Sequence, residues 1–118
     1  MKTDAPLSNK RFDVWHINNR ERITEGYLNP DGCIARWLNN YEDYIMVAVV
    51  EASGLEEIVA MTQNVTKSWT KNKHVLWSKS HDLRSTSVGD VLVHNGKAWL
   101  VAQKGFKAIA EPKAQPLR

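Results

Sequence analysis

The sequence predicts one α+β domain: a small curved, partly barrel-like sheet of mixed or antiparallel strands with one packed helix and one shorter helix. A chain of 118 residues fits a single domain of ordinary size. Within residues 12–109, apolar side chains alternate at strand spacing in several short segments and recur at helical spacing in others. We expect residues 1–11 and 110–118 to be disordered, because they carry Pro and charged side chains without apolar periodicity.

The first third of the chain predicts a strand, a loop and a short helix. Residues 12–17 place large side chains alternately on two faces, which is typical of a strand. Charged and amide residues then dominate, and residues 29–32, Asn-Pro-Asp-Gly, have the composition of a turn. A short helix is expected near residues 32–41, because apolar side chains follow at helical spacing: Ile34, Trp37, Leu38 and Tyr41.

The middle of the chain predicts a covered strand followed by the packed helix. Residues 45–52 are rich in β-branched side chains and apolar on both faces, as in a strand buried on each side. Ser53 is expected to cap a helix over residues 55–63, because Glu56 stands three positions beyond it in a serine-to-glutamate capping spacing. That helix presents one apolar stripe to the sheet and ends at Asn64.

A β-hairpin is the strongest local prediction in the last third. Residues 90–94 and 97–102 form two strands joined by Asn95-Gly96, the dipeptide that best fits a type I′ turn of two residues. Shorter expected segments flank the hairpin: a brief strand over residues 75–77, and a final segment that bends at Gly105-Phe106 and ends at Ile109.

Composition and hydropathy favour a soluble protein of the cytoplasm. Apolar residues make up 42% of the chain and charged residues 25%, as in ordinary globular proteins. The longest apolar run, residues 45–50, is far shorter than the roughly 20 residues of a membrane-spanning helix, and residues 1–10 contain no signal-peptide segment. Cys33 is the only cysteine, so no intramolecular disulfide can form, which agrees with a reducing compartment.

Charge is unevenly distributed along the chain. Residues 1–66 carry six Lys or Arg against ten Asp or Glu, whereas residues 67–118 carry ten against three. A basic half attracts polyanions, which indicates a nucleic acid or an acidic protein as partner. The alternative is that the lysines are solvated and only keep the sheet soluble and its edges unpaired.

The side chains needed for catalysis or metal binding do not cluster in the sequence. The four histidines are dispersed without the close spacing of zinc ligands, and no glycine-rich phosphate loop occurs. Cys33 follows Gly32 near an expected helix start, yet a lone cysteine is most often a small buried apolar residue. We therefore predict a protein that is not an enzyme and that holds neither metal nor cofactor.

Five tryptophans in so short a chain raise the question of an exposed aromatic surface. Trp69 stands among Lys67, Lys71 and Lys73, and aromatic rings among lysines are the components of a surface for single-stranded nucleic acid. We take these four residues as candidate binding residues. The sequence is compatible with two positions for the Trp69 ring: buried in the core, or exposed on a binding surface.

The segment from Arg84 to Asp90, Arg-Ser-Thr-Ser-Val-Gly-Asp, carries a family resemblance. Together with Asn95-Gly96 and Gly105-Phe106, it resembles the C-terminal signature of YodL-like proteins and related small uncharacterised proteins of bacteriophages, plasmids and integrative elements. In those relatives a similar turn opens a hairpin, and a Gly-Phe pair closes the domain. The likeness covers about residues 83–109 and, more weakly, the first strand and the packed helix, whereas residues 18–44 match nothing recognised.

Physical chemistry assigns most of this motif to structure. Gly89 supplies an unusual backbone dihedral at a strand entry, and the side chains of Ser85, Ser87 and Asp90 accept hydrogen bonds from nearby N–H groups. Arg84 is not required by a turn. It is a further candidate binding residue, because a guanidinium suits two-point binding of a phosphate or carboxylate.

The resemblance implies an accessory protein of a phage or other mobile genetic element, acting in the cytoplasm of a bacterial host. Such proteins commonly bind host machinery, including defence systems. The first hypothesis is therefore a non-enzymatic protein that binds a host protein, with counter-defence as one role. The second is a small nucleic-acid-binding barrel that uses the basic C-terminal half, and neither hypothesis involves a membrane.

Overall fold

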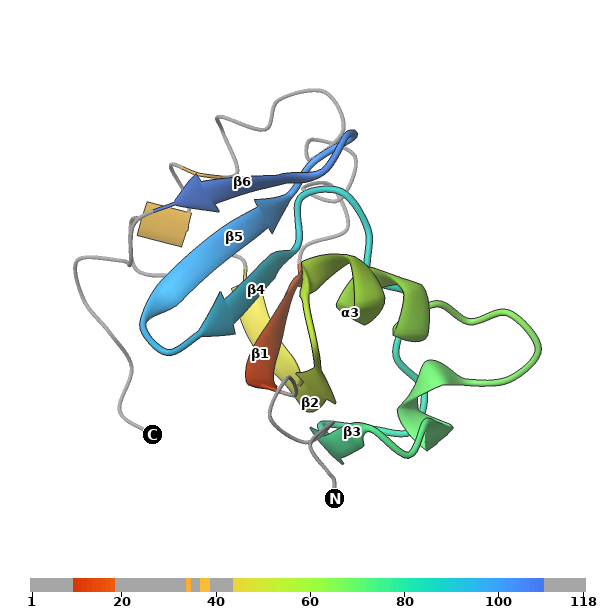
Figure 1. Ribbon diagram of the computed structural model, residues 1–118. Helices are drawn as coiled ribbons and strands as arrows, with labels where there is room; N and C mark the ends of the chain where they lie inside the picture. The colour runs from red at the N-terminus through yellow and green to blue at the C-terminus, as the bar shows by residue number, and fades with distance from the viewer. Residues whose placement is uncertain (1–9, 19–33, 35–36, 39–43, 110–118) are drawn as a thin grey trace, which may run out of the picture.

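The protein folds as one six-stranded antiparallel sheet, seen in a computed structural model that describes residues 10–18, 34, 37–38 and 44–109 (Figure 1). The strands lie side by side in the order β3-β2-β1-β4-β5-β6, and each neighbouring pair is antiparallel. Their bounds are β1 Lys10–Ile17, β2 Tyr44–Ala52, β3 Val75–Ser78, β4 Val91–His94, β5 Lys97–Val101 and β6 Phe106–Ile109. Two helical segments lie between β2 and β3: α3, Leu55–Met61, and the 3-10 turn η2, Trp69–Lys71.

The predicted fold class is wrong in its architecture. The described residues form a mostly antiparallel β structure with the helix α3 and the 3-10 turn η2, and the sheet is open rather than partly barrel-like or mixed. Closure would require the two edge strands to pair. Instead β3 and β6 lie at opposite ends of the strand order, as Figure 1 shows. Short-range alternation identified the strands, but it contains no information on which edges meet.

Both faces of the sheet are covered by apolar side chains, which explains why the strand sequences are apolar on both sides. On one face, Ile58 of α3 packs with Val50 of β2 and Leu92 of β4. On the other face, Trp37 packs with Trp15 of β1 and with three residues of β4 and β5: Val91, Ala98 and Leu100. β1 is therefore a central strand of the core.

The start of α3 differs from the expected serine cap. Gly54 is the N-cap residue, and no side chain caps the helix. The carboxylate of Glu57, not Glu56, accepts hydrogen bonds from the backbone N–H and the hydroxyl of Ser53, at 2.7 and 3.2 Å. Since the helix begins one residue later than a Ser53 cap requires, the acidic residue that reaches back is also one residue later. The helix ends at Met61, before the predicted residue 63.

The hairpin prediction is confirmed. β4 and β5 are joined by two residues, Asn95 and Gly96, with positive φ angles of 51° and 80°, and His94 pairs with Lys97 across the turn. Both positions of a type I′ turn require such angles, which Asn and Gly tolerate best.

Other predictions fall partly outside the described residues. In the expected short helix near residues 32–41, Ile34, Trp37 and Leu38 are helical, and the remaining positions lie outside the described residues. The expected disordered ends also lie outside them, except that Lys10 and Arg11 belong to β1 and pair with β2.

Candidate binding surface

Asp90 is the centre of a buried polar cluster beside β1. It is completely buried, and its carboxylate accepts hydrogen bonds from both terminal nitrogens of Arg84, each at 2.7 Å. The backbone N–H groups of Ser87 and Ile17 donate to the same carboxylate at 2.8 and 2.9 Å. These hydrogen bonds and the positive charge of Arg84 compensate the loss of water around the Asp90 carboxylate, which a buried charge requires.

The remaining contacts of Arg84 also lie within the protein. Its guanidinium donates to the backbone carbonyls of Ser85 and Ile17, at 3.0 and 3.1 Å. Its own carbonyl accepts a hydrogen bond of 2.8 Å from the indole Nε1 of Trp69. Arg84 therefore joins the turn before β4 to β1 and to η2, and its side chain is about one-third exposed.

His16 extends the cluster on β1. The buried imidazole Nε2 lies 2.8 Å from the hydroxyl of Thr86 and 3.8 Å from a carboxylate oxygen of Asp90. Burial lowers the pKa of His16 to about 4; the nearby Asp90 carboxylate opposes this shift, and the Arg84 guanidinium adds to it. The imidazole is consequently neutral at neutral pH.

Gly89 and Ser85 of the Arg84–Asp90 motif hold the turn against β5 and the end of α3. Gly89 adopts a φ of 97°, which L side chains rarely adopt, and its N–H bonds to Val101 of β5 at 2.8 Å. The Ser85 hydroxyl accepts from the N–H of Asn64 at 2.8 Å, which ties the turn to the end of α3. Further along the chain, Gly105 has a φ of 70° in the turn that leads to Phe106, the first residue of β6.

The four candidate residues around Trp69 come together in one groove. Lys67, Trp69, Lys71 and Lys73 all line a groove of about 510 Å³ between the end of α3 and η2. The other lining residues are Ala60, Met61, Gln63, Val65, Thr66, Ser68, Asn72 and His74. None of the described residues that line it is acidic. We call it the basic groove.

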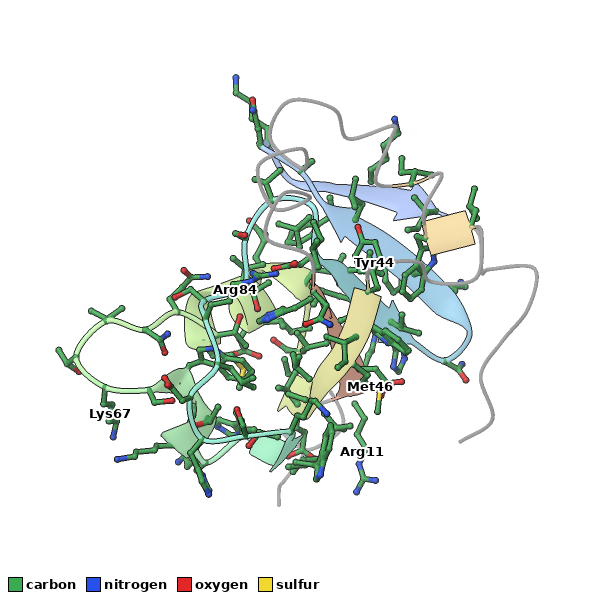
Figure 2. All side chains as sticks on the ribbon, turned by 180° about the vertical axis from the view of Figure 1, so that it is seen from behind. Arg11, Tyr44, Met46, Lys67 and Arg84 are labelled. Carbon is green, nitrogen blue, oxygen red and sulfur yellow. The ribbon has the colours of Figure 1, made fainter. Side chains whose placement is uncertain are left out.

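Trp69 forms a wall of the basic groove rather than an exposed platform. Only 3% of its surface is exposed, because the ring packs in the core on the α3 side of the sheet. Its backbone N–H donates to the side chain of Asn64 at 3.0 Å. The three lysines are exposed, and Figure 2 shows Lys67 on the loop after α3, pointing away from the sheet and well apart from Arg84.

Sequence reasoning missed the exposed apolar residues next to this groove. Leu76 and Trp77 of the edge strand β3 are 44% and 46% exposed, and Val65 in the groove is 84% exposed. The signal was present in the sequence, because residues 75–77 form an apolar run with Lys73 and Lys79 on either side. The run by itself predicts only a brief strand, because its exposure depends on β3 being at an edge of the sheet.

Within the described ranges, no three side chains of His, Cys, Asp or Glu gather closely enough to hold a metal ion. Cys33 lies outside the described residues. None of the helices in the described part of the chain combines the length and apolar character needed to cross a bilayer.

Comparisons with known proteins leave the chain without an assigned family. The resemblance to YodL-like proteins stays a prediction from the Arg84–Asp90 motif and the two glycine turns. No protein-family model matches the chain, and no significant match to it was found among curated proteins or solved structures.

Proposed function

We propose that this chain is a small non-enzymatic binding module that docks on a protein of a bacterial host. The observation that carries the proposal is the combination of half-exposed Leu76 and Trp77 on an edge strand with the lysines of the basic groove beside them. Protein interfaces typically place a few large apolar or aromatic anchors at the centre and polar residues at the rim. By resemblance to proteins of mobile elements, host defence machinery is the class of partner that we favour.

Burial of Trp69 and pairing of Arg84 weigh against the nucleic-acid alternative. A platform for single-stranded nucleic acid needs an aromatic face on which bases stack, and the Trp69 ring has none exposed. The guanidinium of Arg84 is already held by Asp90. One observation still favours nucleic acid as a second candidate: three lysines line a single groove without an acidic residue among the described lining residues.

Site-directed photocrosslinking in bacterial cells tests the proposal. A photoreactive phenylalanine analogue in place of Leu76 is expected to form an adduct with one discrete host protein. The same analogue in place of Lys104, an exposed residue near the opposite sheet edge, is the matched control and is expected to give none. Trp77→Ala in the same chain should abolish the adduct at position 76.

The outcome separates the two candidates. Adducts that disappear on nuclease treatment would replace the protein partner with nucleic acid. A pattern of adducts that is the same at positions 76 and 104 would remove the β3 edge as the docking surface.

A further inference from the structure

The outer side of β3 is a sheet edge on which no described strand pairs. On its inner side β3 pairs with β2, and the N–H of Lys79 donates to the carbonyl of Val47 at 2.7 Å. Backbone groups along an antiparallel strand alternate between the two sides. The N–H and carbonyl of Ser78 are therefore directed away from β2, toward the open edge.

The side chains of β3 give this edge an apolar centre. Trp77 lies opposite Val49 of β2, and Leu76 is the extra residue where the register shifts. Both side chains are nearly half exposed. An incoming strand would cover this apolar surface while it bonded to the outward backbone groups of Ser78, which is how β-strand addition combines affinity with side-chain recognition.

The charged side chains closest to β3 along the chain are lysines. Residues 58–81 contain four lysines and no Asp or Glu. Lys73 precedes β3 and Lys79 follows it, both are exposed, and Lys73 also lines the basic groove. A carboxylate near either end of an added strand would thus meet a lysine.

The same lysines oppose pairing of β3 with a second copy of itself. Two copies paired along β3 would bring Lys73 and Lys79 of both copies to the same seam. Like charges directly opposite each other across strands are destabilising, and lysines at edges are a common protection against such pairing. The edge is therefore suited to a partner of different chemistry.

We propose that β3 accepts an extended acidic segment of the partner protein as an additional antiparallel strand. The segment would bond to the backbone of Ser78, cover Leu76 and Trp77 with an apolar side chain, and place carboxylates beside Lys73 and Lys79. This inference rests on the proposed function and adds to it the chemistry of the bound segment.

Fluorescence anisotropy with a defined peptide tests the inference directly. The probe is a labelled octapeptide of alternating glutamate and valine with blocked ends, measured against the full chain at low and at physiological salt. A peptide with lysine in place of each glutamate is expected to bind at least tenfold more weakly. Two further versions of the glutamate peptide are N-methylated on alternate backbone nitrogens, one at the odd and one at the even positions. Only one of the two should lose binding, because only in that version does methylation remove the donors that pair with β3.

Variants of the protein separate charge from strand addition. Combined replacement of Lys71, Lys73 and Lys79 by Ala should weaken the glutamate peptide about tenfold. The matched control replaces Lys97, Lys104 and Lys107 by Ala, which removes the same charge near the other sheet edge and should leave binding unchanged. Ser78→Pro removes the outward N–H at a position where an edge strand tolerates proline, and should abolish binding. If Ser78→Pro does not fold, the methylated peptides still test strand addition, because they are measured against the unchanged protein.

Several results would overturn the inference. One is equal affinity for the glutamate peptide and the lysine peptide. Another is binding of both N-methylated peptides, and a third is no binding of the glutamate peptide at millimolar concentration. A wild-type dimer that Ser78→Pro converts to monomer would identify a second copy as the occupant instead. A discrete host-protein adduct at position 76 would preserve the proposed function even if the acidic strand failed, whereas nuclease-sensitive adducts would remove both.

Discussion

Arg84 and Asp90 form a two-point ion pair in which both N···O distances are 2.7 Å and the carboxylate is fully buried. The pair spans the turn that leads into β4. Through additional bonds from Arg84 to the Ile17 carbonyl and from the Ile17 N–H to Asp90, it fixes that turn on the end of β1. Arg84, which the sequence indicated as a candidate binding residue, thus neutralises a buried carboxylate.

Arg84→Ala should destabilise the fold by about 3 kcal/mol, because it leaves the buried charge of Asp90 without its counter-ion. Urea denaturation followed by tryptophan fluorescence measures the loss. Lys97→Ala is the control, since it removes an exposed charge and should change stability by less than about 0.5 kcal/mol. Unchanged stability of Arg84→Ala together with lost binding would return Arg84 to the set of ligand-binding residues.

Stability should fall as the pH is lowered through the window from 6.5 to about 4, because His16 is neutral when folded and protonated when unfolded. In this window the unfolded state binds the additional proton, so the free energy of unfolding rises with pH. The total change is about 3 kcal/mol if the full shift is realised. Denaturation midpoints at closely spaced pH values measure the slope.

His16→Gln is the control for this pH dependence, because glutamine cannot titrate and keeps a polar group near Thr86. The difference in slope between the two proteins isolates His16 from the carboxylates. Parallel curves for both proteins over the whole window would contradict the assignment.

Gly96→Val should destabilise the protein by about 1 to 3 kcal/mol, because a β-branched side chain is strained at a φ of 80°. Thermal melting of the variant measures the effect. Lys97→Val, at the next position, is the control, since it places the same side chain in regular β5 backbone. An unchanged melting temperature of Gly96→Val would contradict the turn geometry.

Trp69→Ala and Trp77→Ala should separate structure from binding. Trp69 is buried and bonded to Arg84, so its removal should cost about 3 to 5 kcal/mol of stability. Trp77→Ala should change stability by less than about 1 kcal/mol, because nearly half of the ring is exposed, while it abolishes the partner adduct at position 76. A Trp77→Ala variant with a lowered melting temperature that still forms the adduct at position 76 would contradict this assignment.

Binding to single-stranded and duplex DNA and RNA should be weak, independent of sequence, and lost near physiological ionic strength. The measurement is a salt titration of wild type and of the combined Lys67, Lys71 and Lys73 alanine variant, in which Arg84 is kept because it stabilises the fold. Sub-micromolar binding that persists at physiological salt and disappears in the variant would promote nucleic acid over a protein partner.

Local sequence chemistry was sufficient for the β4–β5 hairpin, for α3 and for β2, but it did not predict the 3-10 turn η2. Asn95-Gly96 identified its hairpin because only a few residues tolerate positive φ at both positions of the turn. Apolar periodicity located α3 and the covered strand β2, although the helix cap was displaced by one residue from the predicted Ser53. These features depend on neighbours in the chain, which a sequence displays directly.

Tertiary structure alone decided the open sheet, the partner of Arg84 and the difference between Trp69 and Trp77. The strand order leaves β3 at an edge, which exposes Trp77, whereas Trp69 packs under α3. Arg84 finds its counter-charge six residues away only because the turn folds back on β1. Burial and charge pairing depend on which distant segments meet, and alternation of apolar residues is the same for a strand at the edge of a sheet and one at its centre.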